Sequence, residues 1–151
     1  MALMLETPAW GNPVRATTRS VRGQLDMTLN VEAEHLATVR RIIREHLHLW
    51  GVGDQAVGRT LTAVNELLTN VWQHTAPDDK GWRMADLLVQ RVRDGVTAIV
   101  RDQDVREPEQ VVPDLLDESG RGWPLVRALS DDFSVSATEA GKDVWVYIAE
   151  T

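Results

Sequence analysis

Two stretches in the first half of the chain repeat apolar residues every three or four positions, which is the spacing of an amphipathic helix. In the first, from Val31 to about Trp50, the apolar stripe consists of Leu36, Val39, Ile43, Leu47 and Trp50. In the second, from about residue 55 to 75, it consists of Val57, Leu61, Val64, Leu68, Val71 and Trp72. Asn30 and Asp54 precede the two stretches and belong to the residue types that cap helix N-termini. The sequence therefore predicts two consecutive helices, the first ended by Gly51 and the second by Pro77.

Five other segments have the shorter period and the Val, Ile and Leu content of strands. They are Gln24 to Leu29, Met84 to Val92, Val96 to Val100, Phe133 to Thr138 and Asp143 to Ala149. A long acidic connection from Asp102 to Ser119 and a short helix from Pro124 to about Ser130 separate the third strand from the fourth. Clustered hairpins beside segregated helices predict an α+β fold, a two-layer sandwich with helices on one face of a mixed, mostly antiparallel sheet.

The length of 151 residues suits one hydrophobic core, so we expect a single domain over residues 23–151 after a flexible tail over residues 1–22. The formal net charge of -7 argues against direct binding to nucleic acid, which requires a basic surface. No apolar run is long enough to span a membrane or to act as a leader. Because the chain also lacks cysteine, the expected compartment is the cytoplasm.

Three polar residues, Glu66, Asn70 and His74, are four positions apart and line up along one side of the second predicted helix. An ordinary solvated helix face explains such a line equally simply. Small or apolar neighbours such as Ala63 and Leu67 make this side unlike a charged solvent face. A carboxylate and an amide oxygen are also the hard ligands that magnesium accepts beside substrate phosphates. We therefore interpret Glu66 and Asn70 as half of a magnesium-nucleotide site.

Two further groups suit a nucleotide. Asp102 ends a predicted strand, where its carboxylate is placed to accept a hydrogen bond from an adenine amino group, although a loop aspartate is the simpler reading. Gly120, Arg121 and Gly122 precede the short helix, and glycines at a helix N-terminus let backbone N–H groups approach an anion. This pair of glycines is not the dinucleotide fingerprint and also suits a flexible turn.

The order of these groups resembles the GHKL (Bergerat) ATPase superfamily over about residues 24–149, and more narrowly the small actinobacterial anti-sigma-factor serine kinases and ATP-binding regulators. The closest match is NELLTNVWQHT, which has Glu66, Asn70 and His74 at the spacing of the family's N-box. The segments GRGWPLVRALSDDFSV and GKDVWVYI match in placement.

The resemblance implies ATP and Mg²⁺ as cofactors. It makes Glu66 the general base and Asn70 the metal ligand, while Asp102 reads the adenine. It also assigns nucleotide binding to a lid loop and to a residue before the last strand, which here are Gly120, Arg121, Gly122 and Lys142. The implied partners are a sigma factor or a STAS-domain antagonist, on which a serine is the phosphate acceptor, with a homodimer as a further option.

The sequence departs from the family pattern at the glycine motif after Asp102, where Asp104 and Arg106 replace both glycines, and at Asp143, where a threonine or serine is frequent. These departures favour a second hypothesis, a non-catalytic binding module that keeps the fold with a degenerate nucleotide site. A sensor histidine kinase is disfavoured because the chain has no helix pair carrying a phosphoacceptor histidine. Arg40, Arg41 and Arg44 form a basic group on the first helix, interpreted either as solvated charge or as a docking surface.

Overall fold

A computed structural model describes residues 2–5, 16–102, 122–139 and 141–150, and in this part of the chain the strands form one seven-stranded sheet. Its order is β1-β2-β3-β4-β5-β7-β6, and each pair of neighbouring strands is antiparallel. The strands are β1 (Ala2–Leu5), β2 (Ala16–Val21), β3 (Gln24–Asn30), β4 (Met84–Val92), β5 (Gly95–Asp102), β6 (Asp132–Thr138) and β7 (Gly141–Ala149).

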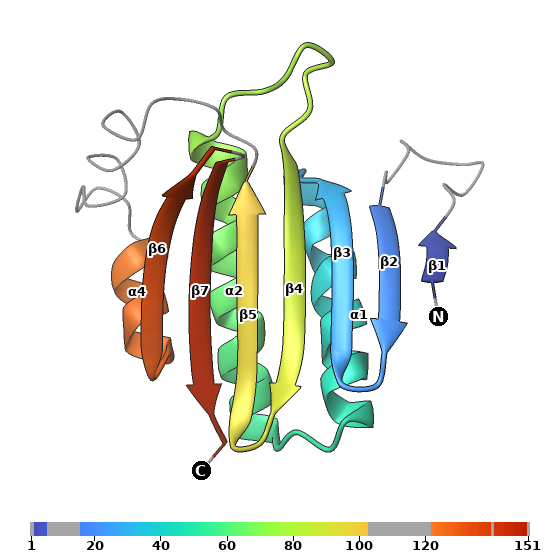
Figure 1. Cartoon of the computed structure of the whole chain (residues 1–151), viewed down its shortest axis with the longest axis vertical. Helices are drawn as coiled ribbons and strands as arrows, with labels where there is room; N and C mark the ends of the chain where they lie inside the picture. The colour runs from blue at the N-terminus through green and yellow to red at the C-terminus, as the bar shows by residue number, and fades with distance from the viewer. Residues whose placement is uncertain (1, 6–15, 103–121, 140, 151) are drawn as a thin grey trace.

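The helices lie together on one face of this sheet (Figure 1). They are the short 3₁₀ helix η1 (Ala33–His35) and the α-helices α1 (Leu36–Leu49), α2 (Asp54–His74) and α4 (Gly122–Leu129). The longest, α2, packs against α1, α4, β5 and β7 and is therefore the centre of the helical layer. This arrangement confirms the predicted α+β sandwich with its helices on a single face.

The N-terminal part of the chain differs from the prediction. Residues 16–21, which the sequence placed in a flexible tail, form β2 and pair with β3, and residues 2–5 form β1 on the outer side of β2. The segment reads ATTRSV, whose apolar content is too low for a strand to be recognised by its pattern alone. The segment forms a strand because its backbone hydrogen-bonds to the edge of the sheet, although its side chains show no strand pattern.

The prediction of Asn30 and Asp54 as helix N-caps was also wrong. Asn30 is the last residue of β3, where its Oδ1 accepts the backbone N–H of Arg83, and η1 rather than α1 follows it. Asp54 is the first residue of α2, and the cap is Gly53, whose N–H donates to Glu150 Oε2 at 2.7 Å. A polar residue before a helix signals its start, but contacts from elsewhere in the chain decide which residue caps it.

The turn between α1 and α2 follows directly from Gly51, as predicted. Gly51 adopts a positive φ of 76°, which glycine tolerates without strain. Its N–H donates to His48 O and the N–H of Val52 donates to Leu47 O, both at 3.0 Å, which is the double hydrogen bond of a Schellman motif. Val52 is buried beyond the turn, and it fixes the direction in which α2 departs.

The core fills the space between helices and sheet. Alternate residues of β4, β5 and β7 point into it, so each strand has one apolar face toward the helices. On α1 the buried residues are Leu36, Val39, Ile43 and Leu47, four of the five members of the predicted stripe. On α2 the buried set is wider and includes polar Thr60 and Asn70, because this helix has neighbours on both flanks as well as the sheet below it.

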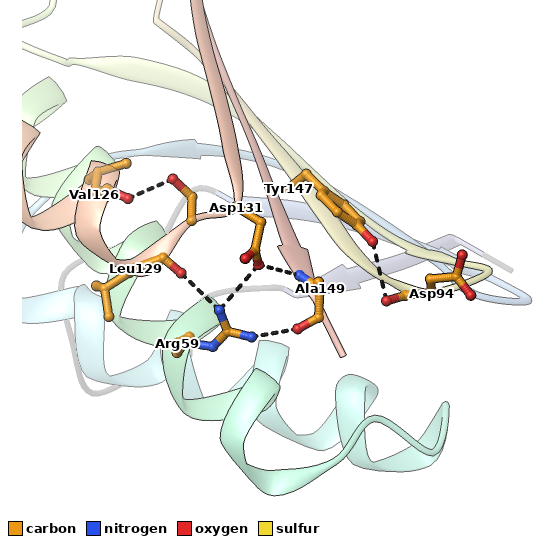
Figure 2. Close-up of polar contacts among 8 residues, drawn as sticks. Arg59, Asp94, Val126, Leu129, Asp131, Tyr147 and Ala149 are labelled. Carbon is orange, nitrogen blue, oxygen red and sulfur yellow. Dashed lines mark hydrogen bonds and ion pairs between the residues drawn. The ribbon is translucent and has the colours of Figure 1, made fainter. Parts of the chain in front are cut away.

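A polar cluster around Arg59 ties α2 to α4 and to the end of β7 (Figure 2). The Arg59 guanidinium donates to Leu129 O at 3.3 Å, to Asp131 Oδ2 at 3.2 Å and to Ala149 O. Asp131 Oδ2 also accepts the N–H of Ala149 at 2.7 Å. That backbone hydrogen bond, followed by the interactions with Arg59, lowers the pKa of Asp131 below its ordinary value. The cluster fixes α4 against α2 and closes the lower end of the sandwich.

Candidate functional site

The predicted catalytic pair lies along the flank of α2 that faces α4. Arg59 marks this flank through its contact with Leu129 of α4, and Glu66 lies only about 20° away from it around the helix, two turns farther along. Asn70 follows one turn later and is 7% exposed, whereas Glu66 is half-buried and His74, at the helix end, is exposed. The three residues therefore do not share a solvated face.

Asn70 has an amide group that its surroundings do not satisfy. Its Nδ2 atom is buried, and within the described residues it has no hydrogen-bond partner. Burying an amide N–H without a partner costs about 1–3 kcal/mol, so such groups in folded proteins usually face a ligand or an ordered water. Asn70 thus has the burial and the unused hydrogen-bonding capacity of a ligand-binding residue.

Asp102 and Lys142 form a buried ion pair on the sheet beneath the helices. They lie directly opposite each other in the β5–β7 register, with Lys142 Nζ 3.0 Å from Asp102 Oδ2. Asp102 is 1% exposed and Lys142 7%. Both residues have the same orientation as the buried Val100 and Val144, so their side chains point toward the helical layer. The two residues assigned separately to nucleotide binding are thus one unit.

The neighbouring rung of the same ladder carries a second ion pair on the opposite face. Arg101 Nε and its terminal nitrogen donate to the two oxygens of Asp143 at 2.6 and 2.8 Å. The hydrogen bond that Arg101 donates to Asp143, and then the charge of Asp143, raise the pKa of Arg101. Asp143 therefore points away from the helical layer. Its carboxylate adds no negative charge to the side on which Asp102 and Asn70 lie.

The remaining predicted site residues fall at or beyond the limit of the described residues. Gly122 is the first residue of α4, so the helix begins two residues before the predicted start at Pro124 and includes this glycine. Gly120 and Arg121 lie outside the described residues, as do Asp104 and Arg106, so their predicted roles and effects stay predictions.

The described parts of the predicted site come together at one end of the molecule. The C-terminal end of α2, the end of β5 and the start of β7 lie at the top of the sandwich in Figure 1. Asn70, Asp102 and Lys142 belong to these three ends. The site therefore combines a buried amide, a carboxylate with its counter-ion, and a half-buried carboxylate at Glu66 one turn below. Only the contact between Asp102 and Lys142 was not foreseen, because 40 residues separate them and the strand register is not visible in the sequence.

The fold agrees with comparisons to known proteins. A family model described as the histidine kinase-like ATPase domain matches residues 29–148. A comparison with the curated proteins found no match.

Within the described residues, no helix is long and apolar enough to cross a membrane.

Two solved structures show the same fold. One is the crystal structure of the RsbU and RsbW domains of Rv1364c from Mycobacterium tuberculosis, with a TM-score of 0.65 at 20% identity over 87% of this chain. The other is the histidine kinase domain from the blue-light activated histidine kinase EL346 of Erythrobacter litoralis, with a TM-score of 0.51 at 21% identity over 81% of this chain. The chain covers 33% of the first and 62% of the second.

The family match includes every described residue of the predicted site, from Glu66 and Asn70 on α2 to Asp102 and Lys142 on the sheet. It confirms the resemblance to the GHKL superfamily that the N-box suggested, and the antiparallel sheet with its helical layer confirms the fold. The chain belongs to the histidine kinase-like ATPase family.

Proposed function

We propose that this protein is an anti-sigma-type regulator that binds Mg-ATP between α2, α4 and the ends of β5 and β7. The observation that carries the proposal is the buried, unsatisfied amide of Asn70 on the α4 flank of α2, one turn from Glu66. The family match supports nucleotide binding as the general activity. The fold similarity to a chain with an RsbW domain agrees with the narrower resemblance to anti-sigma-factor kinases.

The described donors fit a magnesium nucleotide. Asn70 offers one amide oxygen to the metal and an N–H to a phosphate oxygen, which is the partner that Nδ2 lacks. Bound magnesium would neutralise charge on the β- and γ-phosphates. Asp102 accepts from the exocyclic amino group of adenine, and Lys142 keeps the buried carboxylate compensated. By the family resemblance, Gly120, Arg121 and Gly122 at the start of α4 would cover the phosphates.

Glu66 is the proposed general base. In this proposal its half-buried carboxylate, one turn from Asn70, accepts the proton of a serine hydroxyl on the antagonist. As that oxygen bonds to the γ-phosphorus, the bond from phosphorus to the β–γ bridging oxygen breaks and ADP leaves. The products are a phosphoserine on the partner and ADP, with the proton on Glu66.

The second candidate function is a binding module that keeps the fold without catalysis. One observation favours it specifically: Asp102 is already paired with Lys142, so adenine must share a carboxylate that has a strong partner. The replacement of both glycines by Asp104 and Arg106 points the same way. In this version the chain regulates through protein contacts alone.

Titration calorimetry with Mg-ATP on the full chain separates the two functions. The kinase version predicts measurable binding, at least tenfold weaker in Asn70→Ala and retained in Glu66→Gln, because the amide side chain preserves the shape of Glu66 and removes only its basicity. Gln55→Ala, exposed at the N-terminal end of α2 and so at the opposite end of the helix from Asn70, is the matched control and leaves binding unchanged. Absence of both heat and thermal shift at millimolar Mg-ATP rejects the kinase version.

The proposed partners are a sigma factor or a STAS-domain antagonist, and a second copy of the chain is a further option. The basic group on α1 is the proposed contact surface, but its members differ. Arg40 donates to Asn65 Oδ1 of α2 at 2.6 Å and holds the two helices together, whereas Arg41 and Arg44 are exposed. Charge reversal at Arg41 and Arg44 therefore tests docking without disturbing the fold. Unchanged capture of sigma factor and antagonist by the doubly reversed chain would reject this surface.

A further inference from the structure

A second group of ligand-type side chains lies at the entry to α1, apart from the nucleotide site. Glu32, Glu34 and His35 come from four consecutive residues that form the cap and the turn of η1. One ligand atom from each lies within 4.8 Å of the others. Because η1 already fixes their backbone, bringing these donors together costs little additional ordering.

The distances within the group suit an ion better than direct hydrogen bonds. His35 Nδ1 is 3.6 Å from Glu32 Oε2 and His35 Nε2 is 3.9 Å from Glu34 Oε1, both longer than a hydrogen bond. Two ligand atoms bound about 2.1 Å from one metal in tetrahedral geometry are roughly 3.4 Å apart. The pair of His35 and Glu32 is already near this separation. Glu34, whose side chain is 61% exposed, is free to swing toward either ring nitrogen.

His35 also has an unsatisfied nitrogen. Its side chain is only 13% exposed, and its Nδ1 atom is fully buried without a hydrogen-bond partner in the part of the chain that is described. A buried ring nitrogen with no partner is uncommon in folded proteins. A cation bound there and shared with the carboxylates would satisfy it.

The surroundings supply the support and the space that such a site needs. Asn30 holds Glu32 in place, since its Nδ2 donates to Glu32 Oε1 at 3.1 Å while its Oδ1 accepts from the Arg83 backbone. A cavity of about 450 Å³ opens beside the group, with room for water or partner ligands. Its lining consists of residues 30–34, Trp72, Gly81 and Arg83.

The cavity lies on the other flank of α2 from the nucleotide site. Trp72 is two helical turns from Asn65, the residue that contacts Arg40 of α1, so it faces α1. Glu66 and Asn70 face α4 instead. The two sites are therefore separated by the width of α2.

We propose that Glu32, Glu34 and His35 bind one divalent first-row transition-metal cation, with zinc as the best match. One imidazole nitrogen and two carboxylates are donors that zinc accepts at nearly equal lengths, whereas magnesium prefers oxygen alone. Glu32 and Glu34 line the cavity, so water in it or a side chain of a docked protein would complete the coordination. This site does not depend on nucleotide binding.

Zinc chloride titrated by calorimetry into the chelator-treated full chain, without nucleotide or magnesium, tests the proposal. The expected result is one zinc per chain, with affinity lowered at least tenfold in His35→Gln and in Glu34→Gln. Glu34 is exposed, so its variant remains informative even where His35→Gln lowers stability. His48→Gln is the matched control, because His48 Nε2 lies the same 3.6 Å from a carboxylate oxygen of Asp54 but, among the described residues, belongs to no group of three metal-type ligands.

Three outcomes would overturn the proposal. The first is the absence of zinc binding. The second is unchanged binding in both Glu34→Gln and His35→Gln. The third is loss of binding in His48→Gln. Asn70→Ala is expected to bind zinc as the parent chain does, so failure of the metal site and failure of the nucleotide site are distinguishable.

Discussion

Replacing Lys142 by methionine is the most decisive test of the buried ion pair. The methionine keeps most of the apolar stem and removes only the ammonium group, which leaves Asp102 with its carboxylate 1% exposed and without its cation. Removing one partner of a buried pair typically costs about 3–5 kcal/mol, because the other charge stays desolvated. For a chain of this size that corresponds to a fall in melting temperature of roughly 6–20 °C.

The adjacent rung of the ladder provides a matched control. Arg101 and Asp143 form a closer pair on the same two strands, at 2.6 Å against 3.0 Å, but the side chain of Arg101 is 46% exposed. Exposed pairs contribute about 0–1 kcal/mol, so Arg101→Met is expected to cost no more than this despite its two short hydrogen bonds. Comparing the stability losses of Lys142→Met and Arg101→Met therefore separates the effect of burial from the effect of a short contact distance.

Urea unfolding followed by tryptophan fluorescence measures both losses, since the chain has six tryptophans. The double variant Asp102→Leu with Lys142→Met is expected to regain most of the lost stability, because an apolar pair leaves no uncompensated charge. Equal losses in Lys142→Met and Arg101→Met, or a double variant no more stable than Lys142→Met, would refute the assignment of a buried, mutually dependent pair.

Two further predictions concern parts of the fold away from the site. Gly95→Ala should lower the melting temperature strongly, because a Cβ there would lie 2.2 Å from Ile148 O. In Gly58→Ala on α2 the added Cβ meets nothing within 4 Å, so this variant should gain up to about 1 kcal/mol of stability. Equal effects of the two variants on stability would contradict the close approach at Gly95. Asp131 has a lowered pKa in the folded state, so its contribution is complete above its ordinary value near 3.8 and is lost as the pH falls below it. Urea unfolding measured across this acid range should show a shallower loss of stability for Asp131→Asn, and an identical pH profile would count against the cluster.

The helices and strands that were predicted correctly can be recognised from the apolar pattern of their own residues. The stripes of α1 and α2 and the alternation of β4 need no knowledge of the rest of the chain. The strands that the prediction missed within the described residues, β1 and β2, are defined by the strands beside them. The ATTRSV sequence of β2 gives a pairing edge to β3 and nothing that a pattern search detects.

The candidate site divides in the same way. Glu66 and Asn70 are visible because helix geometry fixes their relation once α2 is assigned. The pairing of Asp102 with Lys142 requires the β5–β7 register, and the cluster of Glu32, Glu34 and His35 requires the side-chain packing at η1. Sequence spacing predicts the direction of a side chain within one element, whereas contacts between elements depend on how these elements pack.

The β5–β7 register also changes the interpretation of Asp143. From the sequence, a carboxylate in place of threonine or serine counts against nucleotide binding. In the structure Asp143 is bound to Arg101 on the face opposite the helices, so its carboxylate points away from Asp102 and Asn70. Asp143→Thr is therefore expected to leave Mg-ATP affinity, measured by calorimetry, unchanged within about twofold and to cost no more than about 1 kcal/mol of stability. A tenfold gain in affinity would show that the carboxylate acts on the nucleotide from the far face, and would refute the division of the ladder into a binding face and an outer face.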